Sequence, residues 1–388
     1  RLSVAVRLSQ TLGITASLSS DNKYSTQETF SGRWRVTPGS LNLTPIGGTT
    51  GTPLANASGP ASLANPYLDR IQINDAPWNT FKQSGNFKID WRALPSLTLN
   101  FNIQHSRYTG INVDRRLQFQ LGNSGSQGAQ DWGPDFVQTF QRNGSFNVSN
   151  TATEMTITSR DKEGETTSGY IKANFRQGPW TIDASGSHSE SYGHFEDMKN
   201  GHFSGLDLRL QTGRIDFYGI REAIPSQIAV WNNAGVPIDY TKLENFTTDS
   251  DLNAQSGEAY QRDIQKNYNL NVRYDLDFLP FPMGVKVGVA RSVKDARKWG
   301  RGTGYKMRYV GPTLTVDQLK DEYTSGPIFG IAGNQQWAST YKLYDIYKAN
   351  PEYFDPNFDV GIQKDNYNSR ISQTRSIAET TDSGYGMI

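Results

Sequence analysis

Residues 267–293 read NYNLNVRYDLDFLPFPMGVKVGVARSV, and this stretch decides the fold. From residue 267 to residue 278, polar and apolar side chains alternate at a period of two, which is the pattern of a β-strand with one apolar face. After residues 279–284 the alternation resumes, with Val285, Val287 and Val289 on the apolar side. The stretch therefore predicts an antiparallel hairpin with its turn at residues 279–284.

The polar face of this hairpin carries full charges, at Arg273, Asp275 and Lys286. Its turn is flanked by aromatic side chains, among them Tyr274 and Phe278. Apolar residues on one face, charges on the other and aromatics near the strand ends are typical of a membrane β-barrel, which has lipid outside and water inside.

Composition supports this interpretation and excludes several others. Hydrophobic residues make up 35% of the 388 residues, and no run approaches the roughly 18 apolar residues of a membrane-spanning helix. Aromatic residues reach 12%, which suits strands and interfacial girdles. A net charge of +1 without a basic block argues against nucleic acid as a partner. The absence of cysteine removes disulfides and thiolate metal sites.

Tight turns and long connections alternate along the whole chain. Hairpins are expected around residues 2–34, 80–118, 166–195 and 267–300, with a last strand at 376–388. Between them lie polar segments without a strand or helix period, expected to be long loops, at 37–79, 119–165, 196–266 and 301–375. Transmembrane barrels place short turns on the periplasmic side and long loops outside. A soluble all-β protein also has alternating strands, but it mixes its loop lengths more freely.

The turns, loops and last strand of the sequence resemble those of a known family. The turns QTLG at 10–13 and ALPS at 93–96, the long Tyr-rich loops and the incoming strand AETTDSGY at 378–385 resemble the barrel of TonB-dependent outer-membrane receptors. The resemblance implies that residues 1–388 form part of an all-β, antiparallel, up-and-down transmembrane β-barrel of 22 strands, to which they contribute about nine. The plug domain, the energy-coupling segment and the closing strands of the family have no counterpart in this sequence.

The resemblance also implies a function and a location. A receptor of this family would lie in the bacterial outer membrane, surrounded by its lipid, and would take up a siderophore, cobalamin or an oligosaccharide. Energy would come from a TonB-type protein, coupled through a region that precedes Arg1. The alternatives are a passive porin, a lectin-like adhesin, or a soluble or extracellular glycan-binding or glycan-degrading protein.

No enzymatic chemistry, cofactor or metal is expected. The sequence has no G-x-S-x-G, no cysteine nucleophile and no convergent pair of carboxylates. The spacing of His188, His194 and His202 with nearby acids matches no metal motif. The run from Asp249 to Asn253 begins like a calcium loop but lacks its glycine and its final glutamate.

The alternation assigns residues to two faces. Lipid-facing positions are expected at Leu99, Phe101, Ile171, Ile182, Leu270, Val272, Val287 and Val289. Lumen-facing positions are expected at Lys88, Asp90, Asn102, Asn271, Arg273, Asp275 and Lys286.

Aromatic residues in the loops are the candidates for substrate binding, because their rings stack on sugars, peptides or aromatic chelates. These candidates are Trp132, Trp231, Tyr240, Trp299, Tyr305, Tyr309, Trp337 and Tyr341. The alternative is that they pack the loops against one another. The spacing of aromatics in residues 335–348, just before Asn350 and Pro351, also predicts a short loop helix.

Overall fold

A computed structural model describes the chain except for residues 37–61, 122–130, 139–151, 211, 222–223, 233, 248–251, 277–282 and 303. Strands dominate the described residues, and every strand pair is antiparallel. The all-β, antiparallel class predicted from the alternation is confirmed. Among the described residues, no helix combines the length and the apolar character needed to cross a bilayer.

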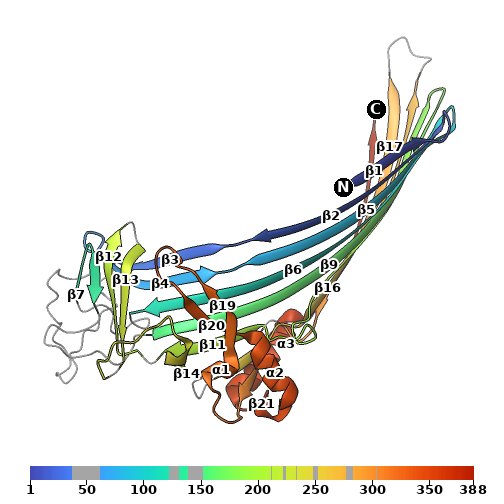
Figure 1. Cartoon of the computed structure of the whole chain (residues 1–388). Helices are drawn as coiled ribbons and strands as arrows, with labels where there is room; N and C mark the ends of the chain where they lie inside the picture. Colours follow the sequence, from blue (N-terminus) through green and yellow to red (C-terminus); the bar gives the residue numbers. More distant parts are fainter. Residues whose placement is uncertain are drawn as a thin grey trace.

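The main sheet follows the chain as a meander (Figure 1). Its neighbouring strands are, in order, β1 (Leu2–Arg7), β2 (Leu12–Ser25), β5 (Trp78–Leu94), β6 (Leu97–Gln120), β9 (Ala152–Gln177), β10 (Trp180–Phe195), β16 (Ala259–Asp275), β17 (Gly284–Trp299) and β22 (Arg375–Met387). Within the described residues β1 and β22 are the two edges of this path and do not pair with each other, so the sheet is open.

Tight turns join the long strands at one end, at the upper right of Figure 1. Gly178 adopts φ +55°, a left-handed conformation that glycine tolerates well, and it lets Gln177 pair with Trp180 across the β9–β10 turn. The predicted hairpin of residues 267–293 is confirmed by the pairing of β16 with β17 from Tyr260↔Trp299 to Asp275↔Gly284. Most of its predicted turn lies at 277–282, outside the described residues.

The long connections at the other end contain more structure than their lack of periodicity predicted. They hold β3 (Glu28–Arg35), β4 (Tyr67–Asp75), β7 (Asp131–Gly133), β8 (Phe136–Gln138), β11 (Gly205–Leu210), β12 (Arg214–Arg221), β13 (Ile224–Trp231), β14 (Phe246–Thr247) and β15 (Asn253–Ser256). They also hold β18 (Tyr305–Tyr309), β19 (Lys320–Ser325), β20 (Gln335–Ala338), β21 (Phe354–Asp355), α1 (Val316–Leu319), α2 (Thr340–Ala349), α3 (Val360–Gln373) and 3-10 turns at Leu243–Asn245 and Pro351–Tyr353. We call these elements the loop cap.

The hydrophobic core lies in the loop cap. β4 pairs with the far end of β6, and β11 pairs with the far end of β9, which begins at Ala152 rather than near residue 166. Large buried side chains there include Tyr67, Leu68, Phe119, Trp132, Phe203, Phe217 and Trp337. Most of these strands are too short to show a period, and their partners are distant in sequence, which hides them from local pattern analysis. The predicted loop helix is confirmed by α2, which the Ser339 side chain caps.

The long strands have one apolar and one polar face, because side chains alternate across a pleat and paired residues share a face. Toward the turn end, the register aligns apolar side chains in rows, such as Ile14↔Ile89, Ile89↔Phe101 and Phe101↔Ile171. The rows continue through β10 into Ile182↔Val272 and Val272↔Val287. We call this region the apolar belt; it includes all eight positions expected to face lipid.

The apolar belt is not covered by the rest of the chain. Leu18, Ile171 and Val289 are 64%, 56% and 60% exposed. The loop cap packs at the other end of the strands, as Figure 1 shows. The belt is therefore an extended apolar surface in the described structure.

Candidate binding groove on the polar face

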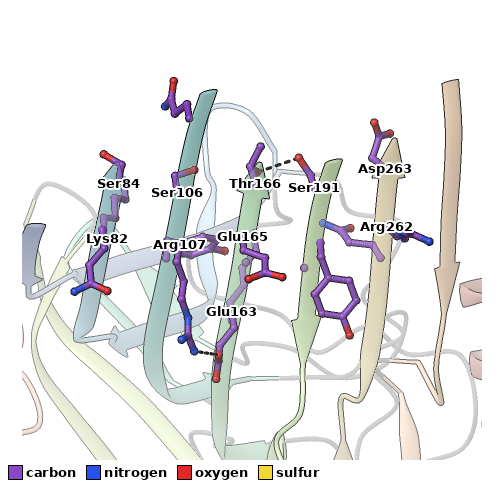
Figure 2. Close-up of a pocket in the computed structure, with 18 of the residues that line it drawn as sticks. Lys82, Ser84, Ser106, Arg107, Glu163, Glu165, Thr166, Ser191, Arg262 and Asp263 are labelled. Atoms are coloured by element: carbon purple, nitrogen blue, oxygen red, sulfur yellow. Dashed lines mark hydrogen bonds and ion pairs between the residues drawn. The ribbon is translucent and has the colours of Figure 1, made fainter. Parts of the chain in front are cut away.

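The polar face is hollowed where the long strands pass between the apolar belt and the loop cap. Side chains from β2 to β22 line a cavity of about 960 Å³ there (Figure 2). A cavity lined from so many neighbouring strands requires the sheet to be concave on this face. We call this cavity the groove.

Two rows of paired residues cross the groove. The upper row, which is the one nearer the loop cap and the lower of the two in Figure 2, is Asp21, Lys82, Tyr108, Gly164, Gly193, Gln261, Lys298 and Arg375. The second row is Ser19, Ser84, Ser106, Thr166, Ser191, Asp263, Ala296 and Ile377. Each row runs across the strands because directly paired residues place their side chains on the same face.

Hydroxyl groups form the floor of the second row. The Ser19 and Ser84 hydroxyls lie 2.6 Å apart, and the Thr166 and Ser191 hydroxyls lie 3.0 Å apart, the latter contact drawn in Figure 2. A hydroxyl both donates and accepts, so this floor can rearrange its hydrogen bonds around a polar ligand.

Tyr108 lies over a glycine at the centre of the upper row. A Cβ atom at Gly164 would lie 2.9 Å from the Tyr108 ring, so the ring occupies the space that a side chain would need. The Lys162 ammonium lies 5.7 Å from the centroid of the same ring. Tyr108 is only half-buried, so its ring forms an aromatic platform on the groove wall.

A second platform repeats this arrangement nearer the turn end. The Tyr385 ring lies so close to Gly288 that a Cβ there would overlap it, and the Lys286 ammonium lies 5.7 Å from the ring centroid. The Tyr385 hydroxyl donates to the Asn271 side chain at 2.8 Å. In both platforms the lysine precedes the glycine by two residues on the strand beside the tyrosine.

The groove rows carry a surplus of positive charge. Their cations are Lys82, Lys298 and Arg375, with Lys162 reaching Tyr108 from just beyond the upper row, and their carboxylates are Asp21 and Asp263. None of these four cations forms an ion pair with another residue in the part of the chain that the structure describes. Arg107 and Glu163 also line the cavity, although alternation points their side chains to the other face, and they are paired with each other at 3.1 Å (Figure 2).

The seven residues predicted to face the lumen share the polar face with the groove, closer to the turn end. Lys88 pairs with Asp90 at 2.8 Å, and Arg273 pairs with Asp275 at 2.7 Å. Asn102 accepts a hydrogen bond from the Asn86 side chain at 2.9 Å. Asn271 and Lys286 belong to the Tyr385 platform.

Four of the eight predicted substrate-binding aromatics instead pack the loop cap. Trp132 is buried and its ring lies 4.9 Å from that of Tyr67. Trp337 is buried and its indole nitrogen donates to Ser325 at 2.6 Å. Tyr240 packs edge-on against Phe119, and burial raises the pKa of Tyr240 to about 12. Tyr309 packs edge-on against Tyr353 and Phe354.

The other four lie apart from one another, and two of them, Trp299 and Tyr341, are exposed. Trp299 stacks on Tyr260 with ring centroids 5.8 Å apart, on the face opposite the groove. Tyr341 lies 4.8 Å from the His202 ring. The rings of Trp231 and Tyr305 are each covered by a guanidinium, from Arg214 and Arg301 respectively. The structure does not bring the eight aromatics into one site, and the packing alternative describes Trp132 and Trp337, which are buried, and Tyr240 and Tyr309, which are partly buried against the core.

The histidines are dispersed rather than gathered. The described residues contain no group of three or more His, Cys, Asp or Glu side chains arranged to hold a metal ion. In the calcium-like run from Asp249 to Asn253, the two acidic residues, Asp249 and Asp251, lie outside the described residues. His202 is buried, with Asp161 3.2 Å from its ring nitrogen. Burial opposes the charged form of His202, but the nearby carboxylate outweighs it and raises the pKa of the imidazole.

The groove itself was not recognised from the sequence. Tyr108, Gly164 and Lys162 come from two strands, and only the pairing register places them together. The sequence does repeat Lys-x-Gly at residues 162–164 and 286–288. This repeat indicates a platform only when a tyrosine is paired with the glycine on the neighbouring strand, which the sequence alone does not show.

Comparisons with known proteins identify no relative of this chain. No protein-family model matches it, and searches of curated proteins and of solved structures find no match. The function must be inferred from the chemistry of the two faces.

Proposed function

We propose that this chain is a wall of a membrane-spanning β-barrel in the bacterial outer membrane, which takes up a scarce, bulky nutrient. The observation that carries the proposal is the apolar belt opposite a polar, concave face. Soluble proteins rarely expose contiguous apolar patches larger than a few hundred Å². Lipid would cover the belt, and water would fill the concave side.

The height of the belt fits a bilayer. On β16 the belt runs from Tyr268 to Tyr274, which spans about 20 Å at the usual strand rise. Membrane barrels carry an apolar band about 25 Å tall with aromatic girdles at its borders. Trp91 and Trp180 lie at the turn end of the belt and supply such aromatics there. β6 and β9 are much longer than the belt, so their far ends would project into the external medium.

The open sheet edges require partners in hydrocarbon. Unpaired backbone groups of β1 and β22 would each cost several kcal/mol if they faced lipid, so further strands must close the wall. The resemblance to TonB-dependent receptors suggests a barrel of 22 strands, with about nine contributed here. In that arrangement a plug and a TonB-type protein would supply energy-coupled release.

A passive porin is the second candidate, since it uses the same wall. The size of the loop cap favours a receptor, because a porin needs only one constricting loop whereas here several long connections fold together around a buried core. Flux through proteoliposomes that contain the intact parent protein separates the two. A porin passes small sugars without an energy source, whereas a receptor closed by a plug does not.

The chain offers a clean test of the membrane wall because it has no cysteine. We would introduce Leu270→Cys and Asn269→Cys singly, label each with an environment-sensitive fluorophore, and reconstitute the protein in vesicles. Brominated lipid should quench the label at residue 270, and aqueous iodide should quench the label at residue 269. Equal access of iodide to both labels would overturn the proposal.

A further inference from the structure

We propose that the groove binds an anionic oligosaccharide, with Tyr108 as the stacking platform and Lys82 and Lys162 as the charge-recognising groups. This inference rests on the proposed uptake function and specifies its substrate class. The groove is a different site from the one expected among the loop aromatics, because it lies on the long strands and on their polar face.

The platform leaves part of the Tyr108 ring open to the cavity. The ring lies within contact distance of Gly164, whose missing side chain leaves room for it, and Tyr108 lines the cavity. Gly193 is paired with Gly164 on the next strand, and the Gln261 side chain lies over it, with the amide nitrogen 3.0 Å from where a Cβ would be. Sugars bind such surfaces by placing their C–H faces on a ring while their hydroxyl groups reach polar neighbours.

Hydroxyl groups surround the platform. Those of Ser84, Ser106, Thr166 and Ser191 lie in the neighbouring row, on the turn-end side of the platform. They can donate to and accept from ligand hydroxyls without leaving a charge unpaired. A purely apolar ligand would bury these hydroxyls without partners, which is unfavourable.

Two lysines lie beside the platform. Lys82 is paired with Tyr108 across β5 and β6, and the ammonium of Lys162, from β9, lies 5.7 Å from the ring centroid. Neither forms an ion pair among the described residues. Two free ammonium groups flanking a stacking ring select a sugar that carries a carboxylate, sulfate or phosphate, because a charged hydrogen bond is about twice as strong as a neutral one.

The two platforms lie far apart along the strands. Tyr385 pairs with Gly288, which pairs with Asn271, and Asn271 lies ten residues along β16 from the Gln261 of the upper row. The two platforms are therefore about 33 Å apart along the strand direction. Each has a lysine 5.7 Å from the ring. Two like platforms at different heights on one concave wall suit a chain of similar units better than a single compact molecule.

The experiment measures binding to the detergent-solubilised full chain by titration calorimetry. The probes are an oligogalacturonate, which is anionic, and a maltooligosaccharide of the same length, which is neutral. The wild type should bind the anionic probe more tightly by about tenfold or more, and this preference should fall as salt increases. Replacing both lysines, Lys82→Gln with Lys162→Gln, should abolish the preference.

Ring variants separate recognition from packing. Tyr108→Leu should weaken binding of both probes by about tenfold or more, whereas Tyr108→Phe should keep most of the affinity because the ring remains. The matched control is Tyr367→Leu in α3, where the tyrosine is 57% exposed and outside the groove. If Tyr108→Leu does not fold, the lysine double variant decides the question.

Two results would overturn the inference. One is that wild type binds neither probe, and the other is that Tyr108→Leu and the lysine double variant bind the anionic probe as the wild type does. In either case the ring over Gly164 would only pack the sheet. The quenching experiment at residues 269 and 270 is independent of ligand, so failure of binding with normal membrane insertion would leave the proposed wall intact.

Discussion

Replacing Leu270 with arginine tests the membrane wall by energetics. The Leu270 side chain is 42% exposed and is paired with Val289 in the apolar belt. At the usual strand rise it lies about 7 Å from Tyr268 and about 13 Å from Tyr274, measured along the strand. In the proposed wall, the aromatic borders would place Leu270 well inside the hydrocarbon. An arginine near the midplane of a barrel wall costs about 2 to 4 kcal/mol.

The adjacent residue provides the control. Asn269 is on the opposite face, where its one side-chain hydrogen bond to a described residue is a long contact to Ser185 at 3.4 Å. An arginine at 269 would project into water on the concave side, and we expect it to cost less than about 1 kcal/mol. The two variants carry the same charge on the same strand, one residue apart, so only the face differs.

The measurement is reversible unfolding by guanidinium in vesicles, followed by tryptophan fluorescence. The predicted difference between the two variants, about 1 to 4 kcal/mol, corresponds to a change of roughly 5- to 1000-fold in the unfolding equilibrium. Equal costs at 269 and 270 would refute the face assignment. A larger cost at 269 would mean that the polar face, and not the belt, is the surface that excludes water.

Three further predictions concern other parts of the molecule. Gly288→Ala should cost about 1 to 3 kcal/mol because its Cβ would overlap a tyrosine ring, whereas Gly386→Ala, with no atom within 4 Å of the added Cβ, should be neutral or stabilising in the same unfolding assay. Trp337→Ala should destabilise the loop cap by about 3 to 5 kcal/mol in denaturant titrations, and a change under about 1 kcal/mol would contradict its buried role. His202 has a raised pKa beside Asp161, so its contribution to stability is complete below its unfolded pKa of about 6.5 and is lost as pH rises through the folded value. Thermal unfolding at pH 6 and pH 8 should show this loss in the wild type and a smaller one in His202→Gln; equal losses in both would reject it.

The sequence by itself determined the long strands, their hairpin partners and their two faces. Alternation at a period of two is a local signal, and a tight turn brings neighbouring strands together without information from elsewhere in the chain. This is why residues 267–293 suffice to predict the β16–β17 hairpin. The same signal placed Lys88, Asn271 and Lys286 on one face, because every second side chain of a strand points to the same side of the sheet.

Only the tertiary structure decided the loop cap and the groove. Strands such as β4 and β11 pair with the far ends of β6 and β9 across long stretches of chain, and neither has a hairpin partner close in sequence. Burial of Trp132 and Trp337 likewise follows from contacts that no local period records. The Tyr108 platform exists because the register sets a ring opposite Gly164, and that match depends on the pairing of β6 with β9, whose tyrosine and glycine are 56 residues apart. Local alternation carries no information about such a distance, so this part of the site is a property of the assembled sheet.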